Sequence, residues 1–242
     1  MEITGNKILI TGGATGIGFG LAERFILEGN TVIICGRRAS ALQEAAAKLP
    51  SVITRQCDLA NHNDRLALYD WIAAEHTDLN VLINNAGVHN WMSLDDPNFY
   101  EKAKNEISIN IESPLHLILL FKELTSLNTI LNVTSALAFV PLTKVPVYSA
   151  TKAFFHSLTL SLRHLLRNAS IEMIEIIPPA LNTDLGGKGI HDAMPSIDSF
   201  IDAVFNQLKE GKKELTYTFS EKYSKIGQPE FQTTFEQMNP TG

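Results

Sequence analysis

Short runs of aliphatic and β-branched residues alternate with longer amphipathic segments along most of the chain. Six of the short runs are nearly continuous in apolar residues, with little alternation between apolar and polar positions. Such runs are typical of strands buried on both faces, as in a parallel sheet. We expect these strands at Lys7–Thr11, Thr31–Cys35, Val52–Gln56, Val81–Asn84, Thr129–Thr134 and Ile171–Ile176, with a short seventh at Glu214–Tyr217.

The segments between these runs have the length and amphipathic pattern of helices. Ser40 and Gln43 have the spacing of a capping box that would start the second helix. The regular alternation predicts one α/β domain over residues 1–242. Its doubly wound parallel sheet would have about seven strands, with helices on both faces and a less regular tail from about residue 220. We expect the helices at Gly16–Glu28, Ala41–Lys48, Asp64–Glu75, Phe99–Leu124, Tyr148–Leu166 and Ile197–Lys209.

Composition narrows the classes of function. The chain carries a formal net charge of −6 with scattered Lys and Arg, which disfavours a nucleic-acid partner. The longest apolar stretch, 115–121, is much shorter than a membrane span. The N-terminus lacks the basic start and apolar core of a signal peptide, so we expect a cytoplasmic protein. Cys35 and Cys57 lack partners at metal-ligand spacing, and we expect buried free thiols and no metal.

A glycine-rich turn follows the first expected strand. Its glycines, at the spacing G-x-x-x-G-x-G, are Gly12, Gly16 and Gly18. Glycines let the backbone approach a pyrophosphate, and the following helix would offer the N–H groups of Thr15, Gly16 and Ile17. A purely structural turn could also carry glycines, but the place between a first strand and an amphipathic helix favours a dinucleotide site.

Two arginines follow the second expected strand. A site for the cofactor without a 2′-phosphate usually has an acidic residue near this point, which binds the ribose. Here Gly36 offers no carboxylate, and Arg37 and Arg38 follow it. Guanidinium groups match the geometry of a phosphate, so the sequence predicts NADP(H) as the cofactor. The alternative is that both arginines are solvated loop residues.

The next two strand ends add small and polar residues. Asp58 and Leu59 follow the third strand, where a carboxylate could accept a hydrogen bond from the adenine amino group. Asn85, Ala86 and Gly87 follow the fourth strand and would form a small, polar wall beside the ribose. Read singly, Asp58 could be a helix cap and Asn-Ala-Gly a simple turn.

The fifth strand and the helix after it carry candidate chemistry. Ser135 ends the strand, Tyr148 lies thirteen residues later, and Lys152 lies four residues after Tyr148. Residues at i and i+4 share a helix face, so Lys152 would lie beside Tyr148. A nearby ammonium favours the phenolate and lowers a tyrosine pKa from about 10. Tyr148 could then transfer one proton while Ser135 holds the substrate oxygen.

These motifs together resemble the short-chain dehydrogenase/reductase family, in its single-domain branch. The likeness runs from about Asn6 to Tyr217 and implies a Rossmann-type fold and an NADP-dependent enzyme acting on CH–OH groups. The matching positions are Thr11–Gly18, Asp58, Asn84–Gly87, Asn110, Ser135, Tyr148 and Lys152. The resemblance also implies a tetrad of Asn110, Ser135, Tyr148 and Lys152, in which the asparagine positions a water of a proton relay.

The loop after the sixth strand departs from the family pattern. The family has Pro-Gly and then a threonine that contacts the nicotinamide, which here correspond to Pro178, Pro179 and Thr183. Pro179 fixes φ and lacks an N–H, so the path of the loop to Thr183 stays open. Within the family, the chain is most similar to a bacterial subgroup associated with D-alanine esterification of teichoic acids, which gives no substrate. Segments that carry this likeness are Val32–Arg37, Gln56–Asp58, Ser161–His164, Pro178–Thr183 and Phe235–Asn239.

Residues beyond the strand ends suggest an apolar pocket for a small carbonyl compound. The expected lining is His89, Asn90, Trp91, Leu137, Phe139, Leu142, Val145, Leu181 and Leu185. His89 could equally be an ordinary loop residue, and the glycines at 186, 187 and 189 suit either a lid or a disordered loop. We expect His116, His156 and His164 on helix surfaces.

Two function classes follow from these features. The first is an oxidoreductase that interconverts a carbonyl compound and an alcohol with NADP(H), with Tyr148 as the general acid/base. The second is an NADP(H)-binding redox sensor without turnover, which would need none of the tetrad. The apolar helices over Phe99–Leu124 and Tyr148–Leu166 suggest a homo-oligomer, a dimer or tetramer.

Overall fold

The structure is a computed structural model that describes residues 1–240. The protein is built on a seven-stranded parallel sheet. The strands are β1 (Lys7–Thr11), β2 (Thr31–Gly36), β3 (Ile53–Gln56), β4 (Val81–Asn84), β5 (Thr129–Val133), β6 (Glu172–Ile177) and β7 (Glu214–Thr216). Their order across the sheet is β3-β2-β1-β4-β5-β6-β7. The doubly wound α/β class expected from the apolar runs is therefore confirmed.

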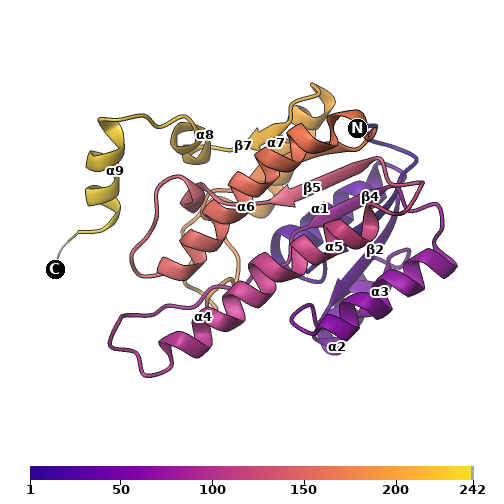
Figure 1. Ribbon diagram of the computed structural model, residues 1–242, viewed down its shortest axis with the longest axis horizontal. Coiled ribbons are helices and arrows are strands. Elements are labelled where there is room, and N and C mark those ends of the chain that lie inside the picture. The colour runs from indigo at the N-terminus through magenta and orange to yellow at the C-terminus, as the bar shows by residue number, and fades with distance from the viewer. Residues whose placement is uncertain (241–242) are drawn as a thin grey trace.

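Helices cover both faces of this sheet (Figure 1). They are α1 (Gly16–Leu27), α2 (Ala39–Lys48), α3 (His62–Glu75), α4 (Phe99–Ile107), α5 (Ser113–Phe121), α6 (Pro146–Leu165), α7 (Ile197–Lys209), α8 (Phe219–Ser224) and α9 (Glu230–Met238). The segment after residue 220, expected to be less regular, contains most of α8 and all of α9. Figure 1 shows α9 at the end of the molecule away from the N-terminus.

Alternate residues of each central strand enter two separate cores. Ile8 and Ile10 pack with side chains of α1, α2 and α7, whereas Leu9 points to the other face and packs with α3, α5 and α6. All three side chains are completely buried. Burial on both faces explains why these strands read as unbroken apolar runs.

The strand order reverses between β1 and β4, because the chain crosses from β3 at one edge to β4 beside β1. Since all strands are parallel, their carboxyl ends lie at the same edge of the sheet. The glycine turn after β1 and the Asn-Ala-Gly segment after β4 therefore lie next to each other. This is the place where sheets of this class bind ligands.

Two expected helix features are wrong. The helix expected over Phe99–Leu124 is interrupted by a π-helical turn at Ser108–Glu112 and ends at Phe121. The expected capping box of Ser40 and Gln43 does not exist, because α2 begins at Ala39 and Arg38 occupies the N-cap without a side-chain bond. Ser40 therefore lies inside the first helical turn.

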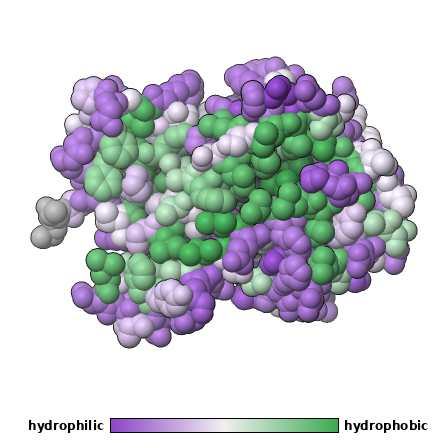
Figure 2. Space-filling model, in the orientation of Figure 1, coloured by the Kyte–Doolittle hydropathy of each residue, from purple (hydrophilic) through white to green (hydrophobic). Residues whose placement is uncertain are grey.

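Apolar side chains reach the surface along α5 and α6. Leu119 of α5 is 49% exposed, and Phe154 and Leu160 of α6 are 40% and 41% exposed. Figure 2 shows apolar residues gathered across this face of the molecule. Among residues 1–240, no helix combines the length and hydropathy needed to cross a membrane.

Candidate active site

The glycine turn packs closely against the end of β4 and the start of α1. Gly12 and Gly16 have φ of +63° and +58°, in the left-handed region that favours glycine. A Cβ on Gly12 would lie 2.9 Å from the Cα of Ala86, and one on Gly18 would overlap the carbonyl oxygen of Gly12. Only glycine fits these positions, so the turn presents bare backbone to the edge of the sheet.

The N-terminus of α1 opens at this turn. Thr15 is the N-cap of α1, and its side chain makes no capping bond to the helix. The first N–H groups of the helix, at Gly16, Ile17 and Gly18, precede the first intrahelical bond, which joins the N–H of Phe19 to the carbonyl of Thr15 at 3.2 Å. Free N–H groups and the partial positive charge of a twelve-residue helix suit a pyrophosphate. The residues present therefore fit a dinucleotide.

Asn85 holds the glycine turn in place. Its Nδ2 donates to the carbonyl oxygens of Thr11 at 2.9 Å and Gly12 at 3.2 Å. The N–H groups of Asn85 and Ala86 both donate to Thr11 Oγ1 at 3.0 Å. The side chain was expected to face a ribose, but its amide nitrogen is directed to the turn. Ala86 and Gly87 follow it at the strand end.

The ends of β2 and β3 place the other expected cofactor residues. Arg37 and Arg38 are exposed, and the carbonyl oxygen of Arg37 accepts a hydrogen bond from Gln56 Nε2 at 3.1 Å. Asp58 Oδ1 accepts from the N–H of Ala60 at 3.1 Å. Asp58 is not the cap of α3, because Asn61 has that role. Leu59 is buried beside Asp58.

Tyr148 and Lys152 lie on α6 and are 7% and 4% exposed. Lys152 Nζ lies 5.5 Å from the centre of the Tyr148 ring and donates to the carbonyl oxygen of Val133 at 2.8 Å. Burial lowers the pKa of Lys152 to about 8. Burial is also the largest cause that raises the pKa of Tyr148 above its usual value; a hydrogen bond from Ser135 opposes this, and the charge of Glu106 adds to it. The lowered Tyr148 pKa expected from Lys152 is not found for the chain alone.

Ser135 and Asn110 approach this pair from two other elements. Ser135 caps a short 3-10 turn at Ala136–Ala138, and its Oγ accepts from the N–H of Leu137 at 3.1 Å. Asn110 lies in the π-helical turn, 2% exposed. A Cβ on Gly87 would lie 3.5 Å from both Asn110 Oδ1 and Lys152 Nζ, so these two groups converge on Gly87.

The amide of Asn110 joins α6 to the segment that follows β4. Its Oδ1 accepts from the N–H of Val88 at 2.9 Å, and its Nδ2 donates to the carbonyl of Val88 at 2.8 Å and to Thr151 Oγ1 at 3.1 Å. A π-helical turn adds one residue to a helix and often occurs at a functional site. Here it turns the side chain of Asn110 inward, and the apolar pattern alone could not show this.

The loop after β6 returns to the glycine turn despite Pro179. The carbonyl of Pro178 accepts from the N–H of Ala136 at 2.9 Å, which ties the ends of β5 and β6 together. Thr183 Cγ2 lies 3.7 Å from the position of a Cβ on Gly16. Thr183 is therefore beside the start of α1, and Pro179 does not divert the loop.

His89 lies directly against Tyr148, with ring centres 5.3 Å apart in an edge-on arrangement. Burial lowers the pKa of His89 and so favours the neutral imidazole. Gly186 packs on the ring so closely that a Cβ there would overlap Nε2. The loop at 184–191 thus covers His89. Of the other expected lining residues, Trp91 lies beside His89, with ring centres 5.7 Å apart.

Glu106 is a site residue that the sequence did not reveal. It lies on α4 one turn before Asn110 and is completely buried. Its Oε1 accepts from the N–H and the Nδ2 of Asn90, at 2.5 and 3.0 Å, while Oε2 has no partner among residues 1–240. Burial raises the pKa of Glu106, opposed by the bonds from Asn90.

We expect the Glu106→Gln variant to gain stability over the unsubstituted protein as pH rises. A carboxyl whose folded-state pKa is raised stabilises the fold below its unfolded pKa, and this contribution is lost as pH rises through the folded value. Glutamine imitates the protonated acid, so the difference in unfolding free energy should be small near pH 4.5. By pH 7.5 it should reach about 1 kcal/mol in favour of the variant. Urea unfolding at both pH values measures this.

The control for this prediction is Glu101→Gln, on the same helix but 70% exposed at the side chain. It should leave the pH dependence unchanged. A Glu106→Gln variant that gained no stability over the unsubstituted protein between pH 4.5 and 7.5 would show that ionisation of the buried carboxyl does not destabilise the fold.

The chain belongs to the short-chain dehydrogenase family: the family model described as short chain dehydrogenase matches residues 6–193. It is 42% identical to the "Uncharacterized oxidoreductase DltE" of Bacillus subtilis (strain 168), over 99% of this chain and 98% of that protein. The fold is similar to a short-chain dehydrogenase of Burkholderia cenocepacia J2315 in complex with NADP, with a TM-score of 0.83, 23% identity and full coverage of both chains.

A second solved structure bears on the cofactor. A short-chain dehydrogenase/reductase of Burkholderia phymatum in complex with NAD has a TM-score of 0.80 and 20% identity, and covers 100% of this chain and 98% of its own. The protein is therefore an oxidoreductase of the short-chain dehydrogenase family. The fold alone does not decide between NAD and NADP, because both occur with it.

Proposed function

We propose that this protein is an NADP(H)-dependent oxidoreductase that interconverts a carbonyl compound and an alcohol, with Tyr148 as the general acid/base. The observation that carries the proposal is the buried group formed by Tyr148, Lys152, Ser135 and Asn110 at the strand ends beside the glycine turn. A pure sensor would not need a buried phenol with a buried ammonium beside it, and both groups are costly to bury.

The residues divide the chemistry as follows. The nicotinamide cofactor, when bound, would supply or accept the hydride. Ser135 would hold the substrate oxygen, and Tyr148 would give its proton to that oxygen in reduction or accept it in oxidation. A raised pKa keeps Tyr148 protonated in the chain alone, which suits the acid role in reduction. Lys152 would stabilise the phenolate after proton transfer, and Asn110 would position the relay that returns the proton.

The preference for NADP(H) rests on the exposed guanidinium groups after β2. Arg37 and Arg38 follow Gly36 where the ribose of a dinucleotide would lie, and neither is engaged in an ion pair among the described residues. A guanidinium is matched to a phosphate in charge and in shape. The other cofactor contacts we propose come from Gly12, Thr15, Gly16, Ile17, Gly18, Asp58, Leu59, Asn85, Ala86, Gly87, Tyr148, Lys152, Pro178 and Thr183.

We expect NADPH to be oxidised with a panel of aldehydes and ketones, and at a higher kcat/KM than NADH. The Arg37→Glu variant should lose at least 30-fold of this preference, because it removes a charge-assisted bond worth about 2 kcal/mol and adds a repelling charge. Initial rates of absorbance loss with both cofactors measure the preference. Arg167→Glu, the same change at an exposed site outside the strand ends, should leave it intact. Equal rates with NADH and NADPH would remove the proposal for NADP(H).

A further inference from the structure

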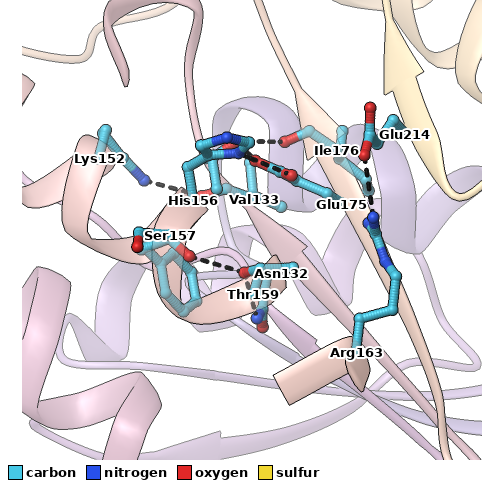
Figure 3. Close-up of polar contacts among 12 residues, drawn as sticks. Asn132, Val133, Lys152, His156, Ser157, Thr159, Arg163, Glu175, Ile176 and Glu214 are labelled. Carbon is cyan, nitrogen blue, oxygen red and sulfur yellow. Dashed lines mark hydrogen bonds and ion pairs between the residues drawn. The ribbon is translucent and has the colours of Figure 1, made fainter. Parts of the chain in front are cut away.

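At the end of β5, Val133 and Thr134 are held by side chains of two different elements, α6 and β6; Figure 3 shows Val133 with Lys152. The carbonyl of Val133 accepts from Lys152 at 2.8 Å. Thr134 donates through its Oγ1 to Glu175 Oε1 at 2.7 Å, and its N–H donates to the carbonyl of Ile176 at 2.9 Å. Ser135 follows at once. The position of the Ser135 hydroxyl therefore depends on how firmly Thr134 is held.

Glu175 is a carboxylate buried at the centre of β6. It is 0% exposed, and its oxygens lie 2.9 and 3.0 Å from Nδ1 of His156 on α6. Glu175 raises the pKa of His156, helped by the charge of Glu214 and opposed by burial and by Arg163. An unpaired carboxylate in this place would be strongly destabilising, so the two groups act as one unit. His156, expected on the helix surface, is only half-buried there: its side chain is 22% exposed and its ring nitrogen faces the buried carboxylate.

The pair of Glu175 and His156 also contacts the C-terminal end of the 3-10 turn that Ser135 caps. The rings of His156 and Phe139 lie 4.5 Å apart, and Phe139 closes the 3-10 turn that begins after Ser135. The unit therefore contacts the residue before Ser135 and the residue four positions after it. His156 is one helical turn beyond Lys152 and two turns beyond Tyr148, so one face of α6 carries all three.

We propose that Glu175 and His156 form a positioning pair, which holds Thr134 and Phe139 and so fixes Ser135 against Tyr148. This inference rests on the proposed function. The pair touches no reacting atom; it acts through Thr134. A displacement of about 1 Å in a group that holds the substrate can reduce a rate by about 100-fold, so small losses of support should be visible in kcat.

The test compares Thr134→Val, which keeps the shape but removes the hydroxyl, with Thr134→Ser, which keeps the hydroxyl. The matched control is Thr159→Val on α6. Thr159 is fully buried, and its hydroxyl accepts from Asn132 Nδ2 at 2.9 Å, one step earlier on the same face of β5 (Figure 3). Thr134→Val removes the buried bond to Glu175 of β6, and Thr159→Val removes the buried bond from Asn132 of β5 to α6. Only Thr134 adjoins Ser135.

We expect kcat with the best carbonyl compound of the panel to fall 10- to 100-fold in Thr134→Val and in Glu175→Gln. Thr134→Ser and Thr159→Val should stay within about threefold of the unsubstituted enzyme, and the Kd for NADPH should be unchanged in all. In a Ser135→Ala background, Thr134→Val should add less than twofold, because the group it positions is already absent. Amide exchange in the segment 134–140 should be faster in Thr134→Val than in Thr159→Val, a readout that needs no substrate.

Equal kcat for the two valine variants, or independent effects of Thr134→Val and Ser135→Ala, would overturn the positioning pair and leave the proposed function standing. Failure of the unsubstituted protein to oxidise NADPH with any carbonyl compound would overturn the proposed function, and this inference with it. Exchange in 134–140 that responds equally to both valine variants would likewise refute the pair.

Discussion

The Tyr148→Phe variant is expected to lose turnover by about 1,000-fold or more while it binds NADPH as tightly as the unsubstituted protein. The change removes one hydroxyl, the proposed proton donor, and general acid catalysis supplies about 100- to 10,000-fold of a rate. The ring remains, so its edge-on contact with His89 and its packing at 7% exposure should persist. Carbonyl-dependent NADPH oxidation measures turnover, and fluorescence titration measures the Kd.

The matched control is Tyr223→Phe, a partly exposed tyrosine on α8 away from the strand ends, which should keep full activity. A Tyr148→Phe variant with more than a tenth of the normal kcat would mean that another group supplies the proton. A parent protein that binds NADPH but oxidises it with no compound of the panel would favour the sensor.

The unbroken apolar runs were enough to predict most of the fold. Strands such as β1 and β2 are buried on both faces, and burial on both faces leaves a pattern that needs no knowledge of the partners. The alternation with helices then predicts a doubly wound sheet and puts the glycine turn at the reversal of strand order. The candidate residues after β1, β2, β4 and β5 came together for the same reason, since parallel strands end at one edge.

The features that were not predicted depend on contacts between distant parts of the chain. The π-helical turn around Asn110 lies between an amphipathic segment, α4, and a largely apolar one, α5, so the periodicity does not mark the extra residue. The side chain of Asn85 is directed to the glycine turn by backbone groups of β1, which no spacing reveals. The roles of the candidate residues in binding and turnover stay predictions.

One signal was present in the sequence and could have been used. The sixth strand was expected to be buried on both faces, yet it contains Glu175. A carboxylate in such a strand requires a charged or donating partner. The search for that partner leads to the histidines of the helices, and in the structure it is His156. Glu106 is harder to infer, because a glutamate on an amphipathic helix is usually solvated.

The Gly18→Ala variant is expected to raise the Kd for NADPH by about 100-fold. The added Cβ would overlap the carbonyl of Gly12 and the Nδ2 of Asn85, and these groups define the turn. Relief of the overlap must displace the backbone N–H groups that would bind the pyrophosphate. The loss of two charge-assisted hydrogen bonds, at about 1.5 kcal/mol each, accounts for a change of this size.

Gly20→Ala separates this effect from simple overpacking. Gly20 lies one half-turn further along α1, and its Cβ would meet the Ile197 side chain at 2.8 Å, on the side of α7 and away from the turn. Both variants should lower the melting temperature, because each inserts a methyl group into a close contact. Only Gly18→Ala should raise the Kd for NADPH. If both variants bound NADPH with the parental Kd, the glycine turn would not be the phosphate site, and the proposed place of the dinucleotide at the reversal of strand order would have to be abandoned.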